Sequence, residues 1–211
     1  MTILAVGAHP DDIEIGCAGM LLARAGAGEH IVMLVMTEGQ RGPGGDREAR
    51  GERLNPVRRG EQGAAAEALG AQLIWGGQMD CEIPVNHDTV DLVGAVIANV
   101  DPSLVLTHWG GDSHQDHRAV SAIVTAAARR HPNILYFGGA SSTGFDPSVY
   151  VDITEYIDAK VAAIRLHASQ VGASVMTDPE GLRSVARARG ISARARYAEG
   201  FVPLRLTLPP A

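Results

Sequence analysis

The chain has 211 residues, of which 45% are hydrophobic and 4% aromatic, and its formal net charge is −6. This length fits one domain over residues 1–211, and the negative charge argues against nucleic acid or an anionic membrane as a partner. The apolar runs are too short to span a membrane, and we find no signal peptide. The two cysteines do not form a CxxC pair. Together these features predict a cytoplasmic protein in a reducing compartment.

The first two thirds of the chain alternate between buried strands and amphipathic helices. Strands are predicted at residues 3–6, 30–36, 73–75, 104–107 and 134–137. Helices are predicted at residues 13–22, 56–69, 89–100 and 119–130. The alternation predicts a Rossmann-like α/β fold, in which helices flank a mostly parallel sheet. The sequence contains neither GxGxxG nor GxxxxGK[ST], which argues against a nucleotide cofactor.

The C-terminal third has a less regular pattern. We expect an edge strand at 149–152, a helical segment at 154–170, an Arg-rich helix at 179–188 and a closing strand at 201–208. Earlier in the chain, the loop at residues 40–55 is rich in glycine and charge and follows the second strand. A loop of this length predicts either a lid that contacts substrate or a passive surface excursion.

A first polar motif, Ala8-His9-Pro10-Asp11-Asp12, lies between the first strand and the first helix. Ligands bind at this edge of an open α/β sheet, just beyond the carboxyl ends of the strands. His9 and Asp12 are three residues apart, so a helical turn or tight loop points both at one spot, and Asp11 faces elsewhere. The alternative is an Asp that caps the helix and a His that merely lies in the loop.

A second polar motif, residues 108–117, follows the fourth strand and holds three histidines and two aspartates. It reads His-Trp-Gly-Gly-Asp-Ser-His-Gln-Asp-His. In a doubly wound sheet the first and fourth strands are neighbours, so the two motifs would face one crevice. The alternative is a solvated loop in which His117 caps the next helix. Three protein ligands and a water form a catalytic zinc site, although imidazole and carboxylate also suit Fe²⁺, Mn²⁺ or Co²⁺.

These two motifs resemble those of the PIG-L/LmbE family of zinc-dependent N-deacetylases. His9-Pro10-Asp11-Asp12, with Glu14 and Gly16, is similar to the family's first motif, and His114-Gln115-Asp116-His117, preceded by Asp112, to its second. Weaker similarities extend the match over nearly the whole chain, at residues 37–39, 58–61, 167–170 and 197–201. The resemblance implies acetyl removal from N-acetylglucosaminyl groups, a small-molecule N-acetylated substrate and a homo-oligomer.

The resemblance also implies roles for individual residues. His9, Asp12 and His117 are the implied metal ligands, Asp11 the general base and His114 the group that stabilises the oxyanion, while Asp116 or Asp112 orients a histidine. Two further residues are candidates for substrate binding. Glu38 ends the second strand, and Arg58 begins a helix, where it either binds substrate hydroxyls or a phosphate or is an ordinary surface arginine.

The predicted reaction is hydrolysis of the amide of an N-acetylated amino sugar by metal-activated water. An amidase or esterase acting on another small-molecule conjugate would use the same site. A metal-binding regulatory or scaffold protein is disfavoured, because a pure binding site needs neither Asp11 nor His114. Cys17 and Cys81 are interpreted as small core residues rather than nucleophiles.

Overall fold

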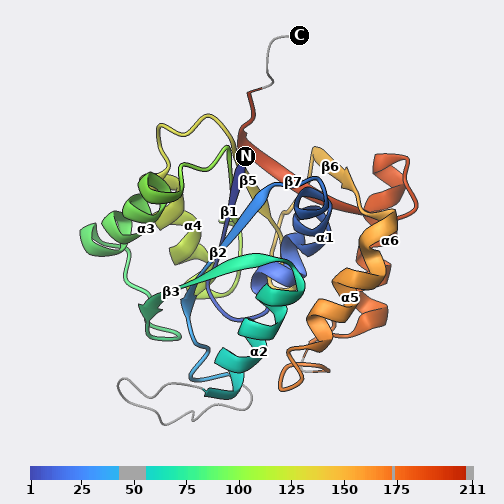
Figure 1. Cartoon of the computed structure of the whole chain (residues 1–211), viewed down its shortest axis with the longest axis horizontal. Helices are drawn as coiled ribbons and strands as arrows, with labels where there is room; N and C mark the ends of the chain where they lie inside the picture. The colour runs from blue at the N-terminus through green and yellow to red at the C-terminus, as the bar shows by residue number, and fades with distance from the viewer. Residues whose placement is uncertain (43–55, 173, 208–211) are drawn as a thin grey trace.

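The computed structural model describes residues 1–42, 56–172 and 174–207, and within these residues seven strands form one sheet (Figure 1). The strand order is β3-β2-β1-β4-β5-β7-β6. The first five strands pair in parallel, and β7 is antiparallel to both β5 and β6. The strands are β1 (Thr2–Gly7), β2 (His30–Thr37), β3 (Ala71–Gln78), β4 (Leu104–His108), β5 (Ile134–Phe137), β6 (Val149–Asp152) and β7 (Ala198–Arg205).

Helices cover both faces of this sheet. Figure 1 shows α3 and α4 on one side of the strands, with α1, α5 and α6 on the other. The helices are α1 (Asp12–Gly26), α2 (Pro56–Ala68), α3 (His87–Val100), α4 (Gln115–Ala127), α5 (Ile157–Arg165) and α6 (Pro179–Ala193), with a 3₁₀ turn at Thr154–Tyr156. None of the helices in the described part of the chain is long and apolar enough to cross a membrane.

Successive residues of the central strands enter two separate hydrophobic cores. In β1, Ile3 and Ala5 pack into the core under α1, whereas Leu4 and Val6 pack into the core under α3 and α4. All four side chains are fully buried. A parallel strand buried on both faces has an unbroken apolar sequence, which is why the central strands are recognisable without an alternating pattern. The predicted mostly parallel α/β fold is confirmed.

Several element boundaries differ from those predicted, and three of these differences change which residues contact one another. Helix α4 begins at Gln115 instead of residue 119, so the last three residues of the second motif lie in its first turn. The helical segment predicted to reach residue 170 ends at Arg165, and Ser169 binds Glu61 of α2 through both its amide and its hydroxyl. Strand β7 covers 198–205 instead of 201–208 and lies between β5 and β6, because it pairs with both.

The predicted lid loop falls largely outside the described residues, which stop at 42 and resume at 56. At its described start, Gln40 is buried and Arg41 donates from its backbone amide to Asp80 Oδ2 over 2.9 Å. The Arg41 side chain also donates to the Asp80 carbonyl oxygen over 2.9 Å. The start of this loop is therefore attached to the segment that follows β3.

Candidate metal and catalytic site

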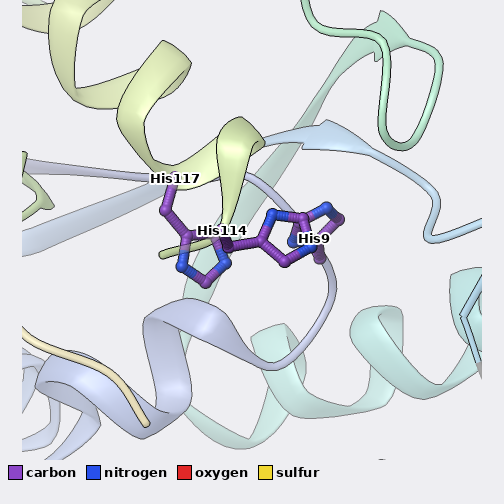
Figure 2. Close-up of side chains that lie close together, drawn as sticks. All are labelled: His9, His114 and His117. Carbon is purple, nitrogen blue, oxygen red and sulfur yellow. The ribbon is translucent and has the colours of Figure 1, made fainter. Parts of the chain in front are cut away.

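The two polar motifs meet at the switch point of the sheet. Strands β1 and β4 pair in parallel, with Val6 opposite Thr107, so the predicted neighbour relation is confirmed. The segment after β1 carries His9, and the segment after β4 carries His114 and His117 (Figure 2). In Figure 2 the three rings project from these two segments toward one another. Residues more than 100 positions apart thus form one cluster because the strands that carry them are adjacent.

The implied metal ligands lie within contact of one another. His9 Nδ1 is 3.2 Å from Asp12 Oδ2, and His117 Nε2 is 3.3 Å from Asp12 Oδ1. Bonds of about 2.0–2.2 Å at a tetrahedral angle would separate neighbouring ligand atoms of Zn²⁺ by roughly 3.3–3.5 Å. All three side chains are buried. The two histidines thus contact opposite oxygens of Asp12, and imidazole with carboxylate is a donor set that suits Zn²⁺.

Each of the two histidines has a carboxylate at its other ring nitrogen. His9 Nε2 is 3.1 Å from Asp116 Oδ2, and His117 Nδ1 is 3.3 Å from Asp112 Oδ1. A carboxylate in this position fixes the tautomer and the orientation of a metal-binding imidazole. Asp116 and Asp112 thus contact the side chains of His9 and His117, as expected for residues that orient a histidine.

The described residues contain three overlapping groups that could each hold a cation. They are His9 with His114 and His117, Asp12 with His108 and His117, and His9 with Asp80 and Asp116. The implied set of His9, Asp12 and His117 spans the first two groups. His108 fits less well, because its Nε2 already accepts from the amide of Ala8 over 3.0 Å.

Burial and paired charges set opposite protonation states in this cluster. Burial lowers the pKa of His117, but Asp12 and Asp112 outweigh it and raise the pKa to about 9. His9 also has a raised pKa, because hydrogen bonds to Asp116, Asp12 and Asp80 outweigh its burial. Burial and the charge of His117 lower the pKa of His108 to about 4. Without a metal, His9 and His117 therefore hold protons at neutral pH that a metal would displace.

Asp11 is held apart from the ligands in an unusual conformation. It is the N-cap residue of α1, yet its side chain makes no capping hydrogen bond, and its φ is 94°. Burial and the adjacent charge of Asp12 raise the pKa of Asp11 to about 7, while Arg58, 3.5 Å from Asp11 Oδ2, opposes the shift. A carboxylate of this pKa can both accept and return a proton near neutral pH. The alternative interpretation, an Asp that caps the helix, therefore does not hold for the side chain of Asp11.

His114 is the N-cap residue of α4. Its Nδ1 accepts from the amide of Asp116 over 3.2 Å, so the neutral ring carries its proton on Nε2. Burial and the nearby charges of His9 and His117 lower the pKa of His114. The arrangement therefore favours a neutral imidazole that donates a hydrogen bond, the role required of an oxyanion donor.

A cavity of about 250 Å³ opens beside these groups. It is lined by His9, Asp11, Arg41, Gly42, Arg58, Asp80, Cys81, His114 and Gln170. A second cavity of about 250 Å³ shares Asp11 and Gln170 with the first and also reaches Asp12, His108 and His117. The proposed base thus borders both spaces.

The two candidate substrate-binding residues differ in their surroundings. Arg58 is buried, lines the first cavity and donates to the Pro10 carbonyl oxygen over 2.6 Å, so it is not an ordinary surface arginine. A methyl group on Gly39 would lie 2.0 Å from Arg58 Nη1, and Gly39 has a φ of 64°, so both the space and the backbone there require glycine. Glu38 is buried and pairs with Arg59, and it is not among the residues that line either cavity.

Sequence reasoning missed Asp80 and assigned no role to His108, the first residue of the second motif. Asp80 Oδ1 lies 3.1 Å from His9 Nε2, and hydrogen bonds to His9 hold the pKa of Asp80 well below its usual range despite burial. Cys81, expected in the core, instead lines the cavity and donates from its backbone amide to Asp116 Oδ2 over 2.7 Å. Asp80 follows β3 and His108 ends β4, so the strand-end argument used for the motifs could have found both.

Comparison with known sequences connects this site to a family. The profile of the PIG-L family, described as GlcNAc-PI de-N-acetylase, matches residues 4–128, more than half of the chain. The chain belongs to the PIG-L family. An Escherichia coli protein named uncharacterized deacetylase YaiS is 35% identical to it over 79% of this chain and 90% of that protein. Diacetylchitobiose deacetylase from Thermococcus kodakarensis is 30% identical over 95% of this chain and 83% of that enzyme.

Solved structures extend the similarity over the whole PIG-L fold. A conserved protein from Thermus thermophilus superposes with a TM-score of 0.84 at 26% identity and covers 99% of this chain and 96% of its own. The 4-carboxy-2-hydroxymuconate hydratase of Pseudomonas putida superposes with a TM-score of 0.83 at 25% identity, over 100% of this chain and 99% of that enzyme. Proteins similar to this chain along its length therefore include a deacetylase and a hydratase.

Proposed function

We propose that the protein is a metal-dependent N-deacetylase that hydrolyses the acetamide of an N-acetylated amino sugar. The observation that carries this proposal is the contact of His9 and His117 with the two oxygens of Asp12, while Asp11 lies beside them on the cavity wall. The PIG-L family supplies the deacetylase chemistry, and the relative from Thermococcus kodakarensis suggests a chitobiose-like sugar as the first substrate to try.

His9, Asp12 and His117 would hold the metal, with Asp116 and Asp112 orienting the two imidazoles. When bound, Zn²⁺ supplies a Lewis acid that acidifies water and polarises a carbonyl. Asp11 takes a proton from the attacking water, and His114 Nε2 donates a hydrogen bond to the oxygen on which charge develops. The C–N bond then breaks, Asp11 returns the proton to the amine, and acetate and a free amino sugar leave.

The substrate proposal is tested by acetate release. Zinc-loaded protein should release acetate from N-acetylglucosamine or diacetylchitobiose, and Asp11→Asn should keep its zinc while kcat falls about 10²–10⁴-fold, the usual scale for loss of a general base. Parallel loading with Fe²⁺, Mn²⁺ or Co²⁺ identifies the metal that gives the highest kcat. An Asp11→Asn protein with undiminished kcat would contradict the assignment of the base.

The similarity to the Pseudomonas putida hydratase favours a second candidate function, addition of water to a carbon–carbon double bond. A hydratase would consume 4-carboxy-2-hydroxymuconate without producing acetate, which absorbance and acetate assays separate. Turnover of amide or ester conjugates other than N-acetyl sugars would instead indicate the related amidase or esterase. Loss of each of these reactions with Asp11→Asn would show that they share one site.

A further inference from the structure

Gln62 of α2 reaches into the loop that carries the proposed base. Its side chain is fully buried, its Oε1 accepts from the backbone amide of Asp11 over 3.2 Å, and its Nε2 donates to Glu14 Oε1 over 2.7 Å. Glu14 is also fully buried and lies in the first turn of α1. Gln62 thus connects the backbone of the first motif to a fixed carboxylate of the helix that follows it.

Arg58 holds the other end of the same peptide group. Arg58 Nη2 donates to the Pro10 carbonyl oxygen over 2.6 Å, and this carbonyl and the Asp11 amide belong to one planar peptide unit. Arg58 and Gln62 are four residues apart on α2, so they lie on the same face of the helix, one turn from each other. Both polar atoms of the Pro10–Asp11 peptide are therefore bound by one helix.

This peptide needs such support because of its conformation. Asp11 has a φ of 94° and a ψ of −24°, a region that is strained for a residue other than glycine. The orientation of the Pro10–Asp11 peptide determines in which direction the Asp11 side chain leaves the backbone. If the peptide rotated to a relaxed conformation, the carboxylate would move away from its place on the wall of the cavity.

We infer that Gln62 is a positioning residue for Asp11: with Arg58 it fixes the Pro10–Asp11 peptide in its left-handed conformation and so places the carboxylate of the base. This inference rests on the proposed function, because it assumes that Asp11 acts in the reaction. Gln62 lines neither cavity beside the site and acts only through the backbone of Asp11. Glu14 acts one step further away, by orienting the amide of Gln62.

The test begins with Gln62→Met, which keeps the side-chain length and removes both hydrogen bonds. Because a displacement of about 1 Å can cost 10²-fold in rate, we expect kcat for acetate release to fall roughly 10–100-fold. The zinc content and KM should stay at wild-type values, since no ligand or cavity residue changes. Gln72→Met, on the exposed surface of β3, is the matched control and should leave kcat unchanged.

A charge-swapped pair separates positioning from general damage to the core. Gln62→Glu alone opposes two buried carboxylates and should lower kcat at least as much as Gln62→Met. Combined with Glu14→Gln, it restores an acceptor for the Asp11 amide and a donor between residues 14 and 62, so most of the lost kcat should return. If Gln62→Met fails to fold, the comparison of the Gln62→Glu single variant with this double variant decides the question.

The final experiment combines Gln62→Met with Asp11→Asn in one double variant. Because Gln62 acts through Asp11, the double variant should be no slower than Asp11→Asn alone. A wild-type kcat for Gln62→Met, no recovery in the swapped pair, or multiplicative losses in the combination with Asp11→Asn would each overturn the inference. An Asp11→Asn enzyme with wild-type kcat would instead remove the proposed function, and this inference with it.

Discussion

Helix α1 borders two buried clusters of charge that differ in how they are satisfied. Near its middle, Lys160 and Glu199 pair in the core, and Glu199 also accepts from the amides of Gly19 and Met20 over 2.9 and 2.7 Å. Lys160 donates further to the Ile15 carbonyl oxygen over 2.7 Å. In this pair, an ammonium group and a carboxylate contact each other and backbone groups of α1.

At the start of the same helix, the charges have a different character. Asp12 contacts His9, His108 and His117 within 3.3 Å, and His9 contacts Asp80 and Asp116 within 3.1 Å. These pairs are strong only while the imidazoles carry protons, and a divalent cation can replace those protons. The two buried clusters thus serve different purposes. The Lys160–Glu199 pair stabilises the helix, and the histidine–aspartate cluster can bind a ligand.

The largest effect should come from breaking the histidine–aspartate cluster. His9→Ala or Asp12→Ala removes a metal ligand, so bound zinc and acetate release should both be lost. Metal analysis of the purified protein after dialysis measures the bound zinc, and the acetate assay measures the activity. A His9→Ala protein that retains one equivalent of zinc would show that the ligand assignment is wrong.

Breaking the Lys160–Glu199 pair should affect folding instead of chemistry. Glu199→Gln leaves the charge of Lys160 uncompensated in the core, which typically costs roughly 3–5 kcal/mol of the free energy of unfolding. Urea denaturation measures this loss, while the zinc content and kcat of the folded fraction should not change. The double variant Lys160→Met/Glu199→Leu should recover part of the stability. Loss of zinc in Glu199→Gln would mean that the two clusters are not independent.

The smallest expected effect is a change of stability with pH, which distinguishes the histidine–aspartate cluster from the Lys160–Glu199 pair. Without metal, protonated His117, with its pKa raised from 6.5 to about 9, stabilises the fold fully below pH 6.5 and loses this contribution as pH rises through 9. Asp11, whose pKa is raised from 3.8 to about 7, acts in the same direction but loses its contribution mainly below pH 7, so His117 dominates the fall above pH 7. The Tm of metal-free protein should therefore fall by several degrees between pH 6.5 and 9.

Zinc-loaded protein provides the control for this pH dependence. Its histidine ligands are neutral throughout, so this part of the Tm change should disappear. Scanning calorimetry of both forms at the two pH values gives the comparison. Equal falls in Tm with and without zinc would indicate that the titrating groups lie elsewhere in the protein.

The sequence by itself determined the layered architecture and the location of the site. Apolar runs marked the parallel strands, because a strand buried on both faces has no polar positions. Two patterns marked the candidate metal ligands: the spacing of His9 and Asp12, and the density of histidines in residues 108–117. Residues three apart in the chain lie close together in a helical turn. The rule that parallel strands gather their carboxyl ends at one edge then brought the two motifs together.

Only the tertiary structure decided the partners of these residues. Asp80 contacts His9 from the segment after β3, and Gln62 contacts the amide of Asp11 from a position 51 residues later in the chain. The pairing of Asp116 with His9 and of Asp112 with His117 depends on ring orientations that no spacing specifies. These contacts follow from how α2, α4 and the end of β3 pack around the switch point. A sequence pattern encodes the local geometry of its own segment, whereas hydrogen-bond partners far apart in the chain are set by the packing of the elements that carry them.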